Sequence, residues 1–551
     1  MLRYIIGIDT GGTCTDAVLI DVQSKTVLAT AKVPTTPYRL YESVAHSLSA
    51  ILDKSGISPQ QVSRIAVSTT LATNSVVENK GARVGLFVIG YVKHFKLPVT
   101  AVLYLKGGHT IQGAEEEPLE IEYLVETLTR LSKDVDAYAV CSAMSMVNPT
   151  HELVAEKAIL MLDPKPVFCS HRASDQAGMK ERAATAALHA KLMPLMQTFI
   201  TSVGEAMDDL QLRAALSIIT GNGQAITPDR AINQSGITVA SGPACTALFG
   251  ACQDQKNALV VDVGGTTTDI AMIEDNQPVL AADGCTIAAW VTHMPSVDMY
   301  TGGIGGDSLV VLQNDGTFSI GPARVSPLCM AGEIPDPAGW IGPEPAARCI
   351  GLTDSPEMAT PGDEVILKYL QDNGPVTSSE LRRTAGLSSI ALDKRLEHLA
   401  RGYLVQEAGF TPTDALHVLG RAEFGDPSRS SSGAAALARI AGTDPESFCQ
   451  RVLEQTEERI GSLIINYVAR KTWGTTLASV LDSRHNPILD INFTLRLPII
   501  GLGAAARFFL PAVAQKLSTT VQFPVHFEVG NAVGAAMGAM NQTPDPGKQG
   551  P

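Results

Sequence analysis

The 551-residue sequence lacks the cysteine and histidine spacings that form disulfide frameworks or zinc sites. Its nine cysteines are scattered without a C-x-x-C pair, and no two of its eleven histidines have the spacing of zinc ligands. We therefore expect free thiols, which suit a reducing compartment. The start MLRYIIGIDT has no secretory signal pattern. These absences predict a cytoplasmic protein.

Long apolar runs and an excess of positive charge are also missing. No run reaches the roughly 18 apolar residues of a membrane span, so we expect no contact with a membrane. The formal net charge of −14 argues against a general nucleic-acid surface. A chain of this length exceeds the roughly 250–300 residues that one core usually serves. Several domains are therefore expected.

The sequence instead contains one short pattern twice. The copies read IGIDTGGTCTDAVLID (6–21) and VVDVGGTTTDIAMIED (260–275), and seven of twelve positions are identical from Asp9 and from Asp262. Each copy predicts a strand, a glycine turn and a second strand, followed by third strands at 27–33 and 278–282. Two copies so far apart indicate two related lobes rather than a short-period repeat.

The repeated turn has the composition of an anion-binding loop. Glycines let backbone N–H groups approach an anion, and threonine hydroxyls add donors. An aspartate at the strand end can hold a hydrated Mg²⁺ or orient a water, although it can also simply cap its turn. The candidate residues are Asp9, Gly11, Gly12, Thr13 and Thr15 in the first copy and Asp262, Gly264, Gly265, Thr266 and Thr267 in the second. Asp9 and Asp262 are the predicted metal ligands and catalytic carboxylates; Asp16 and Asp269 either assist the metal or brace the turns.

Strands and helices alternate elsewhere, which predicts an α/β class. Helices are expected over 41–55, 121–131, 150–162 and 179–216, and strands over 65–68, 83–89 and 137–141. Residues 332–362 are rich in Pro and Gly and predict a loop. Residues 363–410 have the pattern of a winged helix. Their basic residues are balanced by acidic ones, so a structural insertion is preferred to a DNA-binding one.

A third motif, LPIIGLGAAARFFLPAVAQKL (497–517), predicts a strand, a Gly-x-Gly-Ala turn and a helix. A helix of small residues, suited to close packing between lobes, follows in EVGNAVGAAMGAM (528–540). In this order the motifs resemble the actin, hexokinase and Hsp70 ATPase superfamily. The resemblance implies a two-lobed, ribonuclease H-like fold with five-stranded mixed sheets that closes on Mg·ATP. It also places Gly501, Gly503 and Ala504 against adenosine.

Within that superfamily the chain looks like the hydantoinase A and 5-oxoprolinase family. The matching segments are STTLATNSVVENKGARVGLFVIGY (68–91), ITVASGPACTALFGA (237–251), MPSVDMYTGGIGGDSL (294–309) and FTPTDALHVLG (410–420). The chain departs from the family at Gly305-Gly306-Asp307-Ser308, where Gly-Gly-Gly-Ser is common. It also has the winged-helix-like insert where the family has a glycine-rich segment.

This resemblance implies ATP-dependent opening of a cyclic amide, such as a hydantoin, 5-oxoproline or a related lactam, through phosphorylation of the amide oxygen. It also implies a B-type partner subunit and an oligomer. The absence of an obvious amidase nucleophile fits a division of the reaction between two subunits. A subunit of an ATP-dependent ketone carboxylase, a small-molecule kinase and an ATP-dependent regulator remain alternatives. The expected domains are a first lobe over 1–190, a second lobe over 191–540 with the insert at 363–410, and a disordered tail over 541–551.

Several further side chains are candidates for the substrate site. Thr69, Thr70, Thr73 and Asn74 either face the phosphate or substrate, or cap a helix that starts near Leu71. Asp298 is a candidate substrate or metal contact, and His293 is either an acid–base group or structural. Cys14 fits a tightly packed turn. For Cys245, the sequence shows no neighbouring base that would make it a nucleophile.

Overall fold

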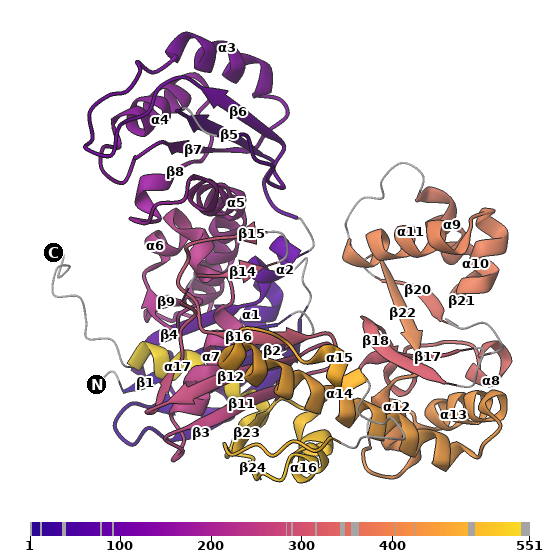
Figure 1. Ribbon diagram of the computed structural model, residues 1–551. Coiled ribbons are helices and arrows are strands. Elements are labelled where there is room, and N and C mark those ends of the chain that lie inside the picture. Colours follow the sequence, from indigo (N-terminus) through magenta and orange to yellow (C-terminus); the bar gives the residue numbers. More distant parts are fainter. Residues whose placement is uncertain are drawn as a thin grey trace. The chain divides into compact units, whose positions relative to one another are not determined.

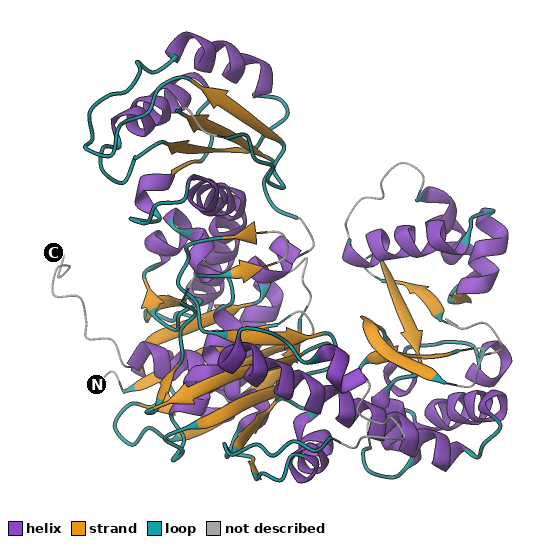
Figure 2. Ribbon diagram, in the orientation of Figure 1, coloured by secondary structure: helices purple, strands orange, loops and turns teal. Residues whose placement is uncertain are grey.

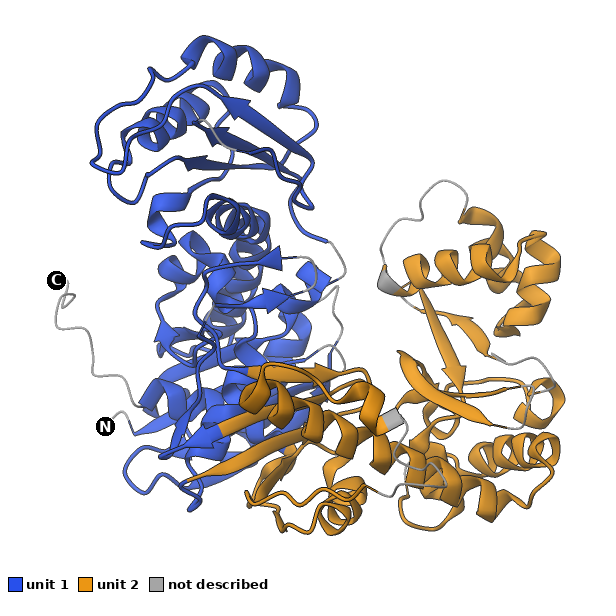
Figure 3. Ribbon diagram, in the orientation of Figure 1, with its two compact units in different colours: residues 1–256, 273–298, 529–551 blue, residues 257–272, 299–528 orange. Residues whose placement is uncertain are grey.

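The computed structural model contains two compact units (Figure 3). Unit 1 comprises residues 1–256, 273–298 and 529–551, and unit 2 comprises 257–272 and 299–528. The structure describes residues 3–11, 14–35, 40–77, 80–90, 93–282, 284–287, 290–313, 317–341, 348–353, 363–402, 404–423, 425–482 and 491–540. The predicted tail over 541–551 lies outside them. Within these ranges, no helix is both long enough and apolar enough to cross a membrane.

Unit 1 is built on a six-stranded mixed sheet with the order β10-β9-β4-β1-β2-β3 (Figure 1). Strands β1 to β3 form an antiparallel meander, and β4 and β9 continue the sheet in parallel with β1. The strand bounds are β1 Tyr4–Thr10, β2 Cys14–Asp21, β3 Val27–Pro34, β4 Val62–Thr69, β9 Ala215–Ile219 and β10 Ala225–Ile226. The repeated glycine turn connects β1 to β2, as the sequence predicts.

The second copy builds a sheet of the same topology. Its order is β13-β12-β11-β23-β24, with β16 also paired to β12. Strand β11 is parallel to β23, which is parallel to β24. The bounds are β11 Ala258–Val263, β12 Thr268–Glu274, β13 Gln277–Pro278, β16 Met299–Gly302, β23 Ile499–Leu502 and β24 Val521–Gln522. Reading β16-β12-β11-β23-β24 against β3-β2-β1-β4-β9 gives one strand order twice, which confirms the two-lobed mixed-sheet fold.

The third strand of the second copy differs from the prediction. Instead of a strand over 278–282, the chain forms the two-residue β13 and a single bridge between Leu280 and Val297. Strand β16 takes the third position, antiparallel to β12. Between β13 and β16 the chain makes the short hairpin β14 (Thr286–Ile287) and β15 (Trp290–Val291) in unit 1. Trp290 is 1% exposed there. The chain therefore buries this hairpin first and forms the third strand only after it.

The long helix α5 forms much of the core of unit 1 and also ends earlier than predicted. It spans Met179–Asp209, and Gln211 then has a positive φ of 55°. Residues 215 and 216, predicted as the end of this helix, instead begin β9 (Ala215–Ile219), because the apolar run satisfies a buried parallel strand equally well. The predicted lobe boundary between residues 190 and 191 falls inside α5, where Ala190 is fully buried.

Helix α17 (Gly530–Met540) returns the chain to unit 1 and packs on the face of the sheet opposite helix α1 (Leu40–Ser55). Ile6 and Ile8 of β1 join the core beneath α1, whereas Gly7 faces α17, because alternate residues of a strand point to opposite faces. A Cβ on Gly7 would lie 2.1 Å from the carbonyl oxygen of Ala532. The small residues of α17 thus permit close packing within unit 1.

A smaller sheet with the order β6-β5-β7-β8, all parallel, follows within unit 1 (Figure 2). Helices α3 and α4 complete its own apolar core. The bounds are β5 Val84–Ile89, β6 Ala101–Leu105, β7 Ala137–Ser142, β8 Val167–Cys169, α3 Ile121–Leu131 and α4 Thr150–Leu162. Both helices have the predicted bounds.

The winged-helix-like insert forms three helices against a small sheet in unit 2. Its elements are β20 Cys349–Leu352, α9 Glu364–Asn373, β21 Val376–Thr377, α10 Ser378–Ala385, α11 Ser389–Arg401 and β22 Val405–Gly409. Leu381, Leu396 and Leu399 pack in its own apolar core. Strand β20 lies within the predicted loop 332–362, which is a correction: β20 is antiparallel to β22 across more than 50 residues of sequence, a pairing that no local pattern reveals.

The rest of unit 2 is mainly helical around the antiparallel pair β17 and β18. Helix α14 packs along α12, α13 and α16. The bounds are β17 Ser308–Leu312, β18 Phe318–Arg324, β19 Ser326–Pro327, α8 Pro337–Trp340, α12 Pro412–Val418, α13 Pro427–Ala441, α14 Pro445–Trp473, α15 Ala478–Asp482 and α16 Ala506–Lys516.

Candidate functional site

The first glycine turn ends β1 with a nearly buried carboxylate. Asp9 is 7% exposed and accepts a hydrogen bond of 2.6 Å from the Ser68 hydroxyl on β4. The N–H of Gly11 donates to the Cys14 carbonyl and closes the turn; Gly12 and Thr13 lie outside the described residues. Thr10 is 2% exposed, and its hydroxyl has no hydrogen-bond partner among the residues that the structure describes. This orphaned hydroxyl is the kind of group that a bound anion satisfies.

Two helices begin beside this turn. Helix α2 (Leu71–Val77) starts after Thr69, whose hydroxyl accepts from the Leu71 N–H, so the capping alternative holds for Thr69. Helix α7 (Ser241–Ala251) starts at Ser241, whose hydroxyl donates to the Thr69 carbonyl at 2.9 Å. The Thr73 hydroxyl accepts from the Ala240 N–H. Segments some 170 residues apart in sequence thereby meet at the first turn.

The start of α7 also approaches the carboxylate itself. A Cβ on Gly242 would lie 3.9 Å from Asp9 Oδ1 and 3.6 Å from the Thr70 side chain. Thr70 is half-buried and its hydroxyl lies between the Thr10 carbonyl and the Asn74 amide. The sequence candidates did not include Ser241 or Gly242. The Ser-Gly-Pro-Ala segment was the available signal, but without the fold nothing placed it beside Asp9.

Thr15 has a different environment from the rest of the first turn. It is fully buried, and its hydroxyl lies 2.8 Å from the hydroxyl of Thr35. The side chain predicted to contact a nucleotide therefore braces the strands that follow the turn.

The second turn, in unit 2, packs on the glycine segment 302–306. The Gly306 N–H donates to the Gly264 carbonyl, and the Asp307 N–H donates to the Gly265 carbonyl at 2.7 Å. A Cβ on Gly305 would lie 2.5 Å from both of these carbonyl oxygens, so only glycine fits there. Thr266 is exposed at the tip, while the Thr267 carbonyl accepts from the Gly264 N–H. The turn is thus rigidly supported and its tip is open.

The predicted adenosine motif lies directly beside the second turn. Gly503 has a φ of 86°, and a Cβ on it would lie 2.4 Å from Asp262 Oδ1 and 2.5 Å from the Val263 carbonyl oxygen. Ala504 is exposed between β23 and α16. Gly501 is buried instead, and a Cβ there would meet the Phe523 ring at 2.5 Å. The structure therefore brings Asp262 and Gly503 together and assigns Gly501 to packing.

The carboxylate that follows the second turn has a shifted pKa. Burial, together with the neighbouring charge of Asp262, raises the pKa of Asp269 to about 6, against hydrogen bonds from Thr301 and Thr267. Because the folded value exceeds the unfolded value of 3.8, protonation favours the fold. That stabilisation is complete below 3.8 and is lost as the pH rises through about 6.

We expect Asp269→Asn, which is neutral at every pH, to match the parent in denaturant midpoint near pH 4 and to exceed it at about pH 8. The measurement is a series of urea unfolding curves across this range. Asp275→Asn, an exposed carboxylate at the end of the same hairpin, is the matched control. A difference between Asp269→Asn and the parent that is independent of pH would contradict the shift.

The three remaining candidates are Asp298, His293 and Cys245. Asp298 is half-buried in unit 1, and its N–H donates to the Val279 carbonyl. His293 Nδ1 lies 2.9 Å from the Ser174 hydroxyl, and its backbone N–H donates to Thr185. Cys245 is fully buried, and burial raises the pKa of its thiol. The structure gives this cysteine no nucleophilic character.

The Thr-Asp-Ala motif has a structural role at its aspartate. Asp414 is fully buried and accepts hydrogen bonds from the backbone of Leu328 and Cys329, from both the backbone and the hydroxyl of Thr411, and from the hydroxyl of Ser430. It therefore joins three segments of unit 2. The adjacent Thr413 supports the second turn, because its hydroxyl donates to the Gly306 carbonyl.

Replacement of Asp414 by Ala would leave these donors buried without an acceptor, so we expect the free energy of unfolding to fall by about 3 kcal/mol or more. Guanidinium unfolding measures this loss. Asp426→Ala removes an exposed helix cap in the same unit and is expected to cost clearly less. Equal losses in the two variants would show that the buried hydrogen bonds of Asp414 contribute no more to the free energy of unfolding than the exposed helix cap does.

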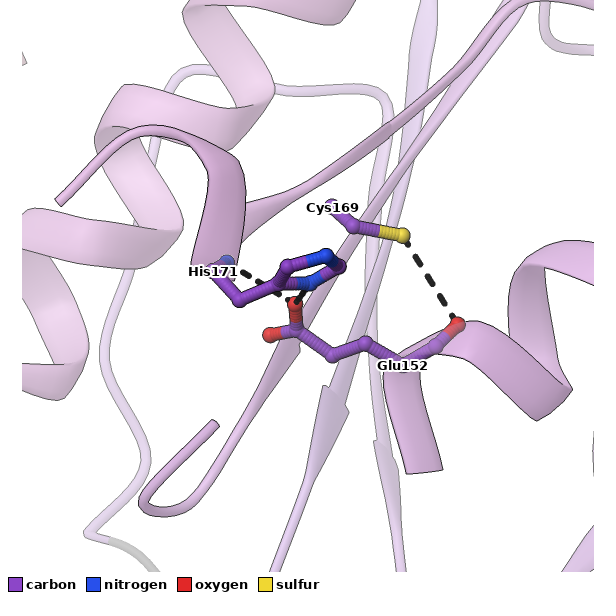
Figure 4. Close-up of side chains that lie close together, drawn as sticks. All are labelled: Glu152, Cys169 and His171. Carbon is purple, nitrogen blue, oxygen red and sulfur yellow. Dashed lines mark hydrogen bonds and ion pairs between the residues drawn. The ribbon is translucent and has the colours of Figure 1, made fainter. Parts of the chain in front are cut away.

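A group of three side chains of the types that bind metals lies at the carboxyl end of the small parallel sheet (Figure 4). The ligand atoms of Glu152, Cys169 and His171 lie within 4.8 Å of one another. However, the Glu152 carboxylate already accepts from the N–H of Ser142, the hydroxyl of Ser170, and both the N–H and Nδ1 of His171. These donors outweigh burial and hold the pKa of Glu152 below its usual value. The group fastens α4 to the strand ends.

The two repeated sheets, each with a carboxylate at its glycine turn, define the class of protein. The fold matches that of acetone carboxylase in a nucleotide-free structure, with a TM-score of 0.68 and 18% identity over 97% of this chain and 70% of that one. It also matches the ATP-dependent caprolactamase from Pseudomonas jessenii, with a TM-score of 0.64 and 19% identity over the same shares. These likenesses confirm the actin/hexokinase-like fold.

Residues 5–162 match the model of the hydantoinase/oxoprolinase N-terminal region, and residues 182–339 match the hydantoinase/oxoprolinase model. The chain belongs to the hydantoinase/oxoprolinase family. It is 26% identical to the caprolactamase alpha subunit of Pseudomonas jessenii over 70% of this chain and 58% of that one. It is 27% identical to the acetophenone carboxylase gamma subunit of Aromatoleum aromaticum over 66% of this chain and 53% of that one. The chain thus spans little more than half the length of these relatives.

Proposed function

We propose that this chain is the ATP-binding component of an enzyme that opens a cyclic amide, working with a B-type partner subunit in an oligomer. The observation that carries the proposal is the repeated turn: in each sheet the central strand has an aspartate as its second-to-last residue, and two glycines follow the strand. The similarity to the alpha subunit of caprolactamase and to the plant protein 5-oxoprolinase 1, 25% identical over half of this chain, supports the substrate class.

The residues present fit a magnesium nucleotide. In unit 1 the orphaned hydroxyl of Thr10 is a donor for an anion, and in unit 2 the exposed Thr266 lies at the open tip of the second turn. Asp9 and Asp262 would hold hydrated Mg²⁺, and Gly503 with Ala504 would lie against adenosine. Mg·ATP would supply the phosphoryl group that makes an amide oxygen a good leaving group.

The chain's own residues would then orient the reactants. Asp9 is held by Ser68, and the starts of α2 and α7 are held by Thr69 and Ser241, so these groups keep their positions without reorganisation. Thr70 and Asn74 are half-buried beside this arrangement, and we propose them as substrate contacts. Asp298 and Thr73 are proposed as further contacts, and a DNA-binding role of the insert is not proposed.

The test is Mg²⁺-dependent ADP release by the purified chain, alone and with its B-type partner, in the presence of hydantoins, 5-oxoproline and lactams of different ring sizes. Stimulation by one cyclic amide would support the proposal and name the ring. Turnover that depends on a ketone and bicarbonate would favour a carboxylase subunit, which the similarity to acetophenone carboxylase also suggests. Absence of both nucleotide binding and turnover would refute the nucleotide site itself.

A further inference from the structure

The register of the first sheet places four polar side chains in one row at the edge that bears the glycine turn. Lys32 of β3 lies opposite Asp16 of β2, Asp16 lies opposite Asp9 of β1, and Asp9 lies opposite Ser68 of β4. Directly opposed residues point to the same face of a sheet. Lys32 therefore lies on the same face of the sheet as the Asp9 carboxylate, which precedes the first turn.

Lys32 is ion-paired within this row and remains accessible to solvent. Its Nζ lies 2.9 Å from Asp16 Oδ1 and 3.0 Å from Oδ2, and the side chains of Lys32 and Asp16 are 45% and 14% exposed. Burial opposes the charge of Lys32, but the carboxylates of Asp16 and, at longer range, Asp9 raise its pKa. The ammonium group is thus charged and accessible, and its ion-pair partner among the described residues is Asp16.

The second copy of the sheet has no equivalent cation. At the position opposite Asp269, strand β16 supplies Thr301 instead of a lysine. The Leu502 position of β23, opposite Asp262, likewise replaces the serine of the first copy. The two copies therefore differ in charge. The difference lies, in each sheet, on the face that carries the turn carboxylate of that sheet.

The carboxylates of Asp9 and Asp16 would repel a phosphate group, because like charges oppose each other. This repulsion would lower the affinity of the site for the phosphate several-fold. An ammonium that can leave Asp16 for a phosphate oxygen would compensate for this repulsion. We propose that Lys32 binds a phosphate group of the nucleotide at the first turn and exchanges its contact with Asp16 for that phosphate. This inference rests on the proposed function, because it requires a nucleotide at the turn.

The test compares Lys32→Met, Lys32→Arg and the parent by calorimetric titration with Mg·ATP and with adenosine, which has no phosphate. We expect Lys32→Met to weaken ATP binding by roughly 10–100-fold, the size of one charge-assisted hydrogen bond. Adenosine affinity should stay unchanged, and Lys32→Arg should remain close to the parent. The matched control is Lys54→Met, because the Lys54 Nζ binds the Thr30 carbonyl on the same strand.

A second variant guards against a folding defect. Lys32→Met leaves Asp16 without its cation, whereas Lys32→Met combined with Asp16→Asn removes both charges. The double variant should still bind ATP more weakly than the parent, but less weakly than Lys32→Met, because the repulsion from Asp16 is gone. Equal ATP affinity of the folded parent and of these variants would overturn the role of Lys32 while leaving the nucleotide site intact. A parent chain that binds neither ATP nor ADP would overturn this inference and the proposed function together.

Discussion

Mg²⁺-dependent ADP release is expected to fall by roughly 10²–10⁴-fold when Asp262 is replaced by Asn. The carboxylate lies on the second-to-last residue of β11, just before the second glycine turn, and Gly503 approaches it so closely that no other residue would fit there. Asparagine keeps the shape of the side chain but removes the charge that would hold a divalent ion or activate a water. The loss should therefore appear in kcat, with little change in folding.

The experiment needs a control that changes an aspartate in the same hairpin. Asp275→Asn serves, because Asp275 is exposed and pairs with Lys256 beyond the end of β12. Asp262→Asn should lose activity while Asp275→Asn retains it, and both should show the parent's thermal unfolding. Retention of activity within about threefold in Asp262→Asn would assign this carboxylate to turn capping, the alternative that the sequence left open.

The second large effect is expected at Gly534 of α17. A Cβ there would lie 2.0 Å from the carbonyl oxygen of Cys245 on α7, which is far inside contact distance and involves backbone on both sides. Gly534→Ala is expected to lower the free energy of unfolding by about 3 kcal/mol, as overpacking of a rigid core does. Urea unfolding, followed by circular dichroism, measures the loss.

Gly204 provides the opposite expectation for the same substitution. It lies in α5 of the same unit, and a Cβ there would meet nothing within 4 Å. Gly204→Ala should therefore raise stability by about 0.5–1 kcal/mol, because alanine loses less backbone entropy in a helix. If Gly534→Ala were as neutral or stabilising as Gly204→Ala, the close contact between α17 and α7 would be disproved.

Local patterns were sufficient to predict much of the fold. The strands on each side of both glycine turns form as predicted, because β-branched residues flank a turn that glycine requires. Helices α3 and α4 have the predicted bounds, since their apolar residues recur at helical spacing. The winged-helix-like pattern over 363–410 likewise forms three helices with their own core.

The errors arose where distant segments decide the structure. Strand β16 replaces the expected strand over 278–282 because the intervening hairpin is buried in unit 1. Strand β20 is extended only because β22 pairs with it. The site shows the same limit: nothing near Ser241 in the sequence indicates that its hydroxyl meets Thr69. The individual roles of the turn residues stay predictions.

The return of α17 to unit 1 has a consequence for the order in which the protein can fold. During synthesis, β1 and α7 emerge first, but the helix that covers Gly7 and Cys245 is made only after residues 257–528. Unit 1 therefore exposes one face of β1 and β4 to solvent or chaperones until α17 has been made. Maturation of the first lobe is thereby coupled to completion of the second.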